Sequence, residues 1–205
     1  LPLNEHLASD AAFDPAAYWP HLLETGQIDG AQYALPVAVA PWITILNADL
    51  ASSSGIEPPA REDFDRDSLL QLALAMQGGP TVPGREHALG YHQFVDPPTT
   101  ALPDVNAWPP LFAYVMSAVG QLRADDGSFD ALRSTQALDA MQFMQDLRKV
   151  HGVEAAPERT GRRVWTTMNE GNLGMFGWSL RGGDEIWLRG PGWPENLLYP
   201  FPRMG

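Results

Sequence analysis

The residues best suited to chemistry in this chain are its tryptophans, and the chemistry they offer is stacking. The 205 residues include seven tryptophans, and an indole face can stack on the apolar face of a sugar ring while polar neighbours bind the hydroxyl groups. Trp108 follows a proline-rich stretch at the start of a predicted helix, and Trp178 ends a predicted strand. Such positions line clefts in α/β folds, so we predict that both tryptophans face one ligand-binding cleft. Filling the core is the competing interpretation of each.

Enzymatic motifs are incomplete. Residues 177–181 read Gly-Trp-Ser-Leu-Arg, in which Arg181 stands where a nucleophile elbow needs its second glycine. All five histidines precede Ser179, which excludes the usual order of serine, acid and histidine in that fold. A glycosidase needs two facing carboxylates, whereas the acids here lie mostly in predicted caps and turns. We therefore predict that the protein is not an enzyme, and a carbohydrate-active hydrolase with an aromatic-lined cleft is the alternative from another class.

Metal and cofactor motifs are also incomplete. Asp63, Asp65 and Asp67 imitate the start of a calcium loop, but the glycine at position six and the glutamate at position twelve of that loop are missing. Cysteine is absent, and His87 and His92 belong to no spacing typical of a zinc site. We predict no cofactor and no bound transition metal.

The charge and the hydropathy of the chain exclude several classes of binding partner and a membrane span. The formal net charge of −12 argues against nucleic acid and anionic lipid, because phosphate groups are bound mainly by lysine and arginine. The longest apolar run, over 34–46, is too short to span a bilayer and contains Pro36 and Pro41.

No signal peptide begins the chain at Leu1, so we expect the start to be processed, truncated or incomplete.

The predicted elements alternate between helices and short strands, which indicates an α/β fold. Asp14, Asp65 and Ser134 are suited to cap helices, and glycines follow the helical patterns. The patterns predict helices over 15–25, 65–76, 108–120, 134–151 and 162–170, and strands over 37–46, 88–95, 173–178 and 197–201.

Two segments carry a family resemblance. Residues 29–59 contain Asp-Gly-Ala-Gln-Tyr-Ala-Leu-Pro, an apolar run, Asn-Ala-Asp-Leu and Gly-Ile-Glu-Pro-Pro in that order. This order resembles the hinge-crossing segment of extracellular solute-binding proteins of family 1, the sugar-binding receptors of ABC importers. Leu46 and Ala48 replace the tyrosine and lysine that are usual there. Residues 170–178, Glu-Gly-Asn-Leu-Gly-Met-Phe-Gly-Trp, resemble a second signature in which a Gly-x-Trp places an aromatic residue in the cleft.

The resemblance implies a receptor that captures ligand without chemistry. Ligand binds between two hinged lobes, and the closed form delivers it to the membrane permease of the importer. The expected partners are a small-molecule carbohydrate and the ABC permease subunits, with no nucleic acid, and the receptor is expected to be a monomer. Its expected location is periplasmic or extracellular, with a lipid anchor left open. A binding protein for a non-sugar solute, such as a polyamine or an osmolyte, is the alternative within the class.

The implied ligand contacts extend beyond the two tryptophans. The family's cleft tryptophan corresponds to Trp178, and Trp42 lies in the hinge-crossing run, where it can line the floor of the cleft. Arg181 can donate a fork of hydrogen bonds to sugar hydroxyls or a uronate, although a solvated surface arginine is an equally good interpretation. Asn106 and Tyr199 are weaker candidates on a loop and at a strand end.

The resemblance also implies a domain organisation. The expected fold is a periplasmic-binding-protein-like lobe of type II, with helices around a small mixed sheet and part of the first lobe at the N-terminus. Residues 1–45 would be a remnant of lobe one with the first hinge crossing, 46–197 lobe two, and 198–205 the start of the return strand. We expect residues 1–45 to pack poorly by themselves and to expose apolar area around Tyr18, Trp19, Leu22 and Leu23.

Overall fold

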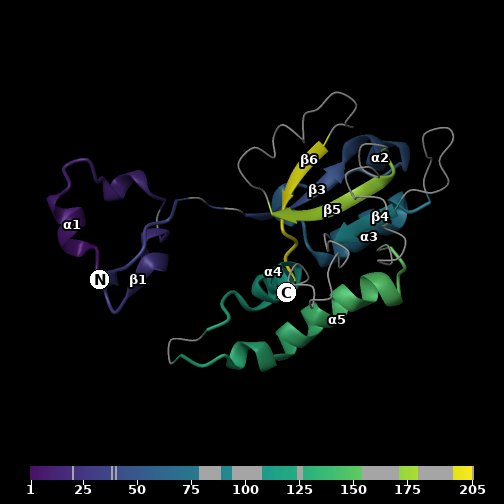
Figure 1. Cartoon of the computed structure of the whole chain (residues 1–205). Coiled ribbons are helices and arrows are strands. Elements are labelled where there is room, and N and C mark those ends of the chain that lie inside the picture. Colours follow the sequence, from purple (N-terminus) through teal and green to yellow (C-terminus); the bar gives the residue numbers. More distant parts are fainter. Residues whose placement is uncertain are drawn as a thin grey trace, which may run out of the picture. The chain divides into compact units, whose positions relative to one another are not determined.

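The computed structural model divides the chain into two compact units, residues 1–40 and 41–205 (Figure 1). The structure describes residues 1–19, 21–37, 39, 41–78, 89–93, 108–123, 127–153, 171–179 and 196–204. Within these residues, no helix is long and apolar enough to cross a membrane. The boundary predicted at residue 45 falls inside a strand of the second unit, so the whole strand belongs with residues 41–205.

In unit 1, residues 1–40, hydrogen bonds to one buried polar residue join several segments. It contains α1 (Asn4–Ser9), the 3-10 turns η1 (Pro15–Ala17) and η2 (Leu23–Gly26), and a hairpin of β1 (Gln27–Ile28) and β2 (Ala31–Gln32). Among its described residues only Gln32 is buried. The backbone N–H of Gln32 donates to Asn4 Oδ1 at 2.9 Å, and its side-chain amide donates to the carbonyls of Leu23, at 3.0 Å, and Ala34. Unit 1 therefore has no apolar core of its own in the described residues.

Unit 1 contains a tight hairpin turn, and short turns in place of the helix predicted over 15–25. Asp29 and Gly30 both have positive φ, of 51° and 77°, as the tight turn between β1 and β2 requires. The single helix over 15–25 was wrong. Asp14 caps a helical turn through Ala16 N–H at 2.9 Å, but the turn ends at Ala17 and His21 has a φ of 68°. The sequence contains a reason for the break in Pro20, because a proline inside a helix has no N–H to donate and clashes with the carbonyl four residues before it.

In the described part of unit 2, residues 41–205, the central element is a four-stranded mixed sheet (Figure 1). Its strands lie in the order β4-β5-β3-β6, and their bounds are Leu89–Gln93, Leu173–Ser179, Trp42–Asn47 and Asn196–Pro200. β3 is antiparallel to both neighbours, while β4 and β5 are parallel. The strand predicted over 37–46 begins only at Trp42, since Pro41 has no N–H to donate to a sheet. From Thr44 to Asn47, β3 is buried on both faces, as the apolar run predicts.

The described residues of unit 2 form the helices α2 (Ala48–Ser53), α3 (Arg66–Met76), α4 (Trp108–Val119) and α5 (Thr135–Lys149), with 3-10 turns η3 (Arg61–Asp63) and η4 (Asp130–Arg133). The sequence patterns predict α3, α4 and α5 but not α2. Asp65 accepts the N–H of Ser68 at 2.9 Å, and Ser134 accepts that of Ala137 at 3.1 Å, so both predicted caps are confirmed. The helix predicted over 162–170 lies outside the described residues.

The core of unit 2 joins the helices to the sheet and to the C-terminal segment. Phe64, Leu69, Met76, Tyr91 and Leu147 are among its fully buried side chains. The segment after β6 is bonded into this core: Arg203 N–H donates to the Phe64 carbonyl at 3.3 Å, and Ser117 Oγ donates to the Pro202 carbonyl at 2.6 Å. Unit 2 is therefore an α/β fold with helices around a small mixed sheet, and it includes β6 and the residues that follow it.

The cap of α3 makes part of the stability dependent on pH. The hydrogen bond from Ser68 N–H to the Asp65 carboxylate lowers the pKa of Asp65 below its ordinary value. A carboxylate with a lowered folded-state pKa stabilises the fold above the unfolded-state pKa of about 3.9. That stability is lost as the pH falls through the folded-state pKa.

We expect Asp65→Ala to lower the free energy of unfolding by about 1 kcal/mol at pH 7, measured by urea denaturation. The difference from the parent should shrink as the pH falls below about 4, because the parent's carboxylate is then being protonated. Asp65→Asn is the matched control, since asparagine caps equally well but does not titrate. An Asp65→Ala deficit that is unchanged at pH 3 would contradict this account of the cap.

Candidate functional site

The strands of unit 2 bring four chain segments to one edge of the sheet. Gln93 at the end of β4 pairs with Gly177 near the end of β5, and Ser179 at the end of β5 pairs with Trp42 at the start of β3. At the same edge Pro200, the last residue of β6, pairs with Ile43. We call this the carboxyl edge, because β4, β5 and β6 all end there. Open α/β sheets bind their ligands outside the carboxyl ends of their strands, so the carboxyl edge is the candidate site.

The carboxyl edge gathers two of the predicted ligand contacts. Trp42 is the first residue of β3 and is half-buried. Trp178 pairs with Ile43, the residue that follows Trp42 in β3. Residues directly opposite each other share a face of the sheet, so positions 42 and 178 belong to opposite faces. A ligand that contacts both must therefore lie across the end of the sheet, in the place where the strands stop.

Most of the other predicted contacts have side chains outside the described residues. Trp108 begins α4, as predicted, and its side chain, like that of Trp178, lies outside the described residues. Arg181 and Asn106 also lie outside them. These predictions stay predictions.

Tyr199 has its ring and its hydroxyl engaged in the core. The side chain is 5% exposed, and its hydroxyl donates to the Pro59 carbonyl at 2.8 Å. Its ring centroid lies 4.8 Å from that of Phe64. Burial raises the pKa of Tyr199, and the positive charge of Arg61 acts in the opposite direction. This position gives no support to the predicted ligand contact of Tyr199.

Sequence reasoning missed a group of residues directly beneath the carboxyl edge. The Tyr114 hydroxyl of α4 donates to the Tyr91 hydroxyl of β4 at 3.0 Å. The Tyr114 ring packs edge-on against Phe201, with the centroids 4.8 Å apart. A Cβ placed on Gly177 would lie 3.0 Å from the Tyr91 hydroxyl oxygen. No local sequence pattern indicates this group, because its members come from four segments that are distant in the sequence.

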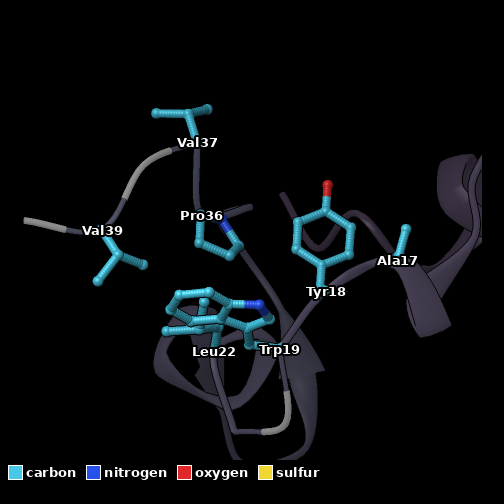
Figure 2. Close-up of a pocket in the computed structure, with 7 residues that line it drawn as sticks. All are labelled: Ala17, Tyr18, Trp19, Leu22, Pro36, Val37 and Val39. Atoms are coloured by element: carbon cyan, nitrogen blue, oxygen red, sulfur yellow. The ribbon is translucent and has the colours of Figure 1, made fainter. Parts of the chain in front are cut away.

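Unit 1 carries an apolar pocket of its own (Figure 2). The pocket has a volume of about 280 Å³. It is lined by Trp19 together with Ala17, Tyr18, Leu22, Pro36, Val37 and Val39, and Figure 2 shows the indole of Trp19 below Pro36, between Val39 and Tyr18. Trp19 is 71% exposed, whereas Tyr18, Leu22 and Leu23 are half-buried. The polar atoms of these side chains are the Tyr18 hydroxyl and the Trp19 indole nitrogen, which leaves the pocket suited to an apolar surface.

Acidic and histidine side chains form no metal site in the described part of the chain. No group of three histidine, cysteine, aspartate or glutamate residues lies close enough there to hold an ion. His92 lies in β4, but its side chain is outside the described residues, as is the whole of His87. The prediction of no bound metal stays a prediction.

Comparison with known proteins places this fold. No family model matches the chain, and no curated protein is similar to it in sequence. Among solved structures it is similar to an ABC substrate-binding protein, Lmo0181 from Listeria monocytogenes in complex with cycloalternan, with a TM-score of 0.71 and 17% identity. That match covers 97% of this chain and 46% of the other.

Two further solved structures are similar to this chain over almost its whole length. UgpB from Mycobacterium tuberculosis in complex with glycerophosphocholine matches 98% of this chain and 47% of its own, at 16% identity and a TM-score of 0.68. Maltose-bound MalE3 of T. maritima matches 99% of this chain and 48% of its own, at 16% identity and a TM-score of 0.66. The fold is that of periplasmic-binding-protein-like solute-binding proteins. The chain spans about half the length of these structures.

Proposed function

We propose that the chain is part of a substrate-binding protein of a carbohydrate ABC importer. The observation that carries the proposal is the structural match to ABC solute-binding proteins over 97% of the chain, at a TM-score of 0.71. Two of the similar structures have maltose and cycloalternan bound. The aromatic residues at the carboxyl edge support the same function, since sugar rings stack on indole faces.

The proposed mechanism is capture without chemistry. Trp42, Trp108 and Trp178 offer aromatic faces to the sugar, and Arg181 and Asn106 offer hydrogen bonds to its hydroxyl groups. The ligand lies between two lobes, a hinge closes on it, and the closed form docks on the ABC permease outside the cytoplasm. The receptor acts as a monomer. The acidic chain, with its formal net charge of −12, suits a neutral ligand.

The domain assignment is part of the proposal. Residues 46–197 would form lobe two, and residues 1–45 and 198–205 would carry the two hinge crossings, the first with a remnant of lobe one. Matches that cover 46–48% of the similar chains support an assignment to about half of such a receptor. The exposed Trp19 pocket supports the lobe-one remnant, because apolar surface of this kind is usually covered by further structure.

A non-sugar solute is the second candidate ligand. UgpB, one of the similar structures, holds glycerophosphocholine. A quaternary ammonium group binds to the faces of aromatic residues, and an arginine such as Arg181 suits a phosphodiester. The predicted contacts would therefore suit either kind of solute.

A panel of four ligands tests the proposed function. Maltose, D-mannitol, α-D-tagatose and glycerophosphocholine would each be added to the protein in thermal unfolding. We expect one of them, at a hundred times its Kd, to stabilise the fold by about 2.7 kcal/mol, which raises the Tm by roughly 5–10 °C. Sucrose at the same concentration controls for general stabilisation by excluded solutes. Chromogenic glycosides should remain uncleaved, and turnover of any of them would favour the hydrolase instead.

A further inference from the structure

Two fully buried tyrosines are hydrogen-bonded to each other beneath the carboxyl edge. Tyr91 lies in the middle of β4 and Tyr114 in the middle of α4, and the Tyr114 hydroxyl donates to the Tyr91 hydroxyl at 3.0 Å. Burying hydroxyl groups costs free energy unless they are paired, and two phenylalanines would fill nearly the same space. What the hydrogen bond adds is a defined position of α4 on β4, because a satisfied buried polar pair specifies one arrangement.

The Tyr91 hydroxyl also lies close to β5, at Gly177. A Cβ on Gly177 would lie 3.0 Å from the Tyr91 hydroxyl oxygen, closer than side chains ordinarily pack, but 4.0 Å from the ring carbon that bears it. The hydroxyl thus occupies the space that a side chain at position 177 would need. Glycine at this position lets the backbone of β5 lie against the hydroxyl without displacing it, one residue before Trp178, whereas a Cβ there would require a small shift.

The same pair reaches the end of β6. The Tyr114 ring packs edge-on against Phe201, which directly follows β6, with the ring planes at 79°. Phe201 Cε2 is also 3.9 Å from the position of a Cβ on Gly177. One hydrogen-bonded pair therefore connects α4 with β4, β5 and the segment after β6, and these three strands all end at the carboxyl edge.

We propose that Tyr91, Tyr114 and Gly177 are positioning residues for Trp108 and Trp178. Trp108 begins the helix that Tyr114 ties to β4, and Trp178 follows the glycine that rests on Tyr91. The tyrosines themselves touch no ligand, since both are fully buried. The consequence for ligand binding rests on the proposed function of the carboxyl edge, whereas the placement of the two tryptophans does not.

Fluorine NMR of protein labelled with 5-fluorotryptophan tests the placement without any ligand. The resonances of Trp108 and Trp178 are assigned by replacing each with phenylalanine. We expect Tyr114→Phe to shift both resonances and Gly177→Ala to shift that of Trp178. Ser134→Ala is the control: it removes the cap of α5, lowers the Tm by about 2–4 °C and should shift neither resonance.

A double substitution tests the contact between Gly177 and the Tyr91 hydroxyl. Tyr91→Phe should lower the Tm of the parent protein, because the hydrogen bond is lost. The same change should raise the Tm of Gly177→Ala, because it removes the oxygen against which the new Cβ is pressed and leaves an ordinary contact. A lowered Tm in both backgrounds would overturn the role of Gly177.

A third experiment measures ligand affinity by calorimetry. The ligand is whichever of maltose, D-mannitol, α-D-tagatose and glycerophosphocholine binds the parent protein. Tyr114→Phe should weaken that binding about fivefold, and Ser134→Ala should leave it unchanged. If none of the four binds, the proposed function fails, and the fluorine spectra still decide the placement of the tryptophans. Resonances that stay in place in Tyr114→Phe while the Tm falls would overturn the proposal.

Discussion

Gly90→Ala is expected to destabilise unit 2 by about 3 kcal/mol, which lowers the Tm by roughly 6–12 °C. A Cβ on Gly90 would clash with the carbonyl oxygen of Ala73 and would lie 2.7 Å from the carbonyl carbon of that residue. Both atoms belong to the backbone of α3, which packs beside β4 (Figure 1), so no side-chain rotation can relieve the clash. Thermal unfolding followed by circular dichroism measures the effect.

Gly55→Ala is the matched control for that substitution. Gly55 has a φ of 72° and no atom within 4 Å of its Cβ position, so alanine there meets only the strain of left-handed backbone. That strain costs about 1–2 kcal/mol. If Gly90→Ala were no more harmful than Gly55→Ala, α3 would not lie against β4 as closely as described.

The parts of the fold that local chemistry determines could be predicted from the sequence. Asp65 and Ser134 accept the N–H groups at the starts of α3 and α5, as their residue types indicate. Gly120 and Gly152 follow α4 and α5 with φ of 77° and 63°, which is the conformation that ends a helix. These signals involve residues a few positions apart, and no tertiary contact overrides them here.

The failed predictions come from treating apolar content as continuous structure. The apolar run over 37–46 contains Pro41, and the strand begins only after it. The helical pattern over 15–25 contains Pro20, and the structure has separate 3-10 turns on either side. In both segments one proline outweighs the hydrophobic pattern around it.

The candidate site could be predicted only in part, because its edge is made by tertiary pairing. The sequence places Trp178 at the end of a strand and Trp42 within the hinge-crossing run, but no local pattern predicts the strand order β4-β5-β3-β6 that brings them together. The hydrogen bond between Tyr91 and Tyr114 is of the same kind. Nothing near either tyrosine in the sequence indicates the other, and only the packing of α4 on β4 makes them neighbours.

The proposed function depends most on Trp178 and Trp108. Alanine at either position is expected to weaken binding of the ligand found in the panel by about 1–3 kcal/mol, or roughly fivefold to 150-fold in Kd. The reason is the loss of one aromatic face that the ligand covers on binding. Calorimetric titration measures the change, and Phe129→Ala, which removes an aromatic ring that is 58% exposed beside η4, should leave the Kd unchanged.

Stability separates this role from that of an ordinary core tryptophan. A tryptophan that fills the core costs about 3–5 kcal/mol when it is truncated, which lowers the Tm by roughly 6–20 °C whether or not ligand is present. A tryptophan that faces the ligand should leave the Tm of the free protein nearly unchanged and remove the stabilisation that the ligand confers. Quenching by acrylamide gives a second criterion, since a cleft tryptophan is reached by the quencher and protected by ligand. Trp178→Ala and Trp108→Ala proteins that unfold easily yet bind the ligand with the parent affinity would assign both residues to the core and remove stacking from the proposed site.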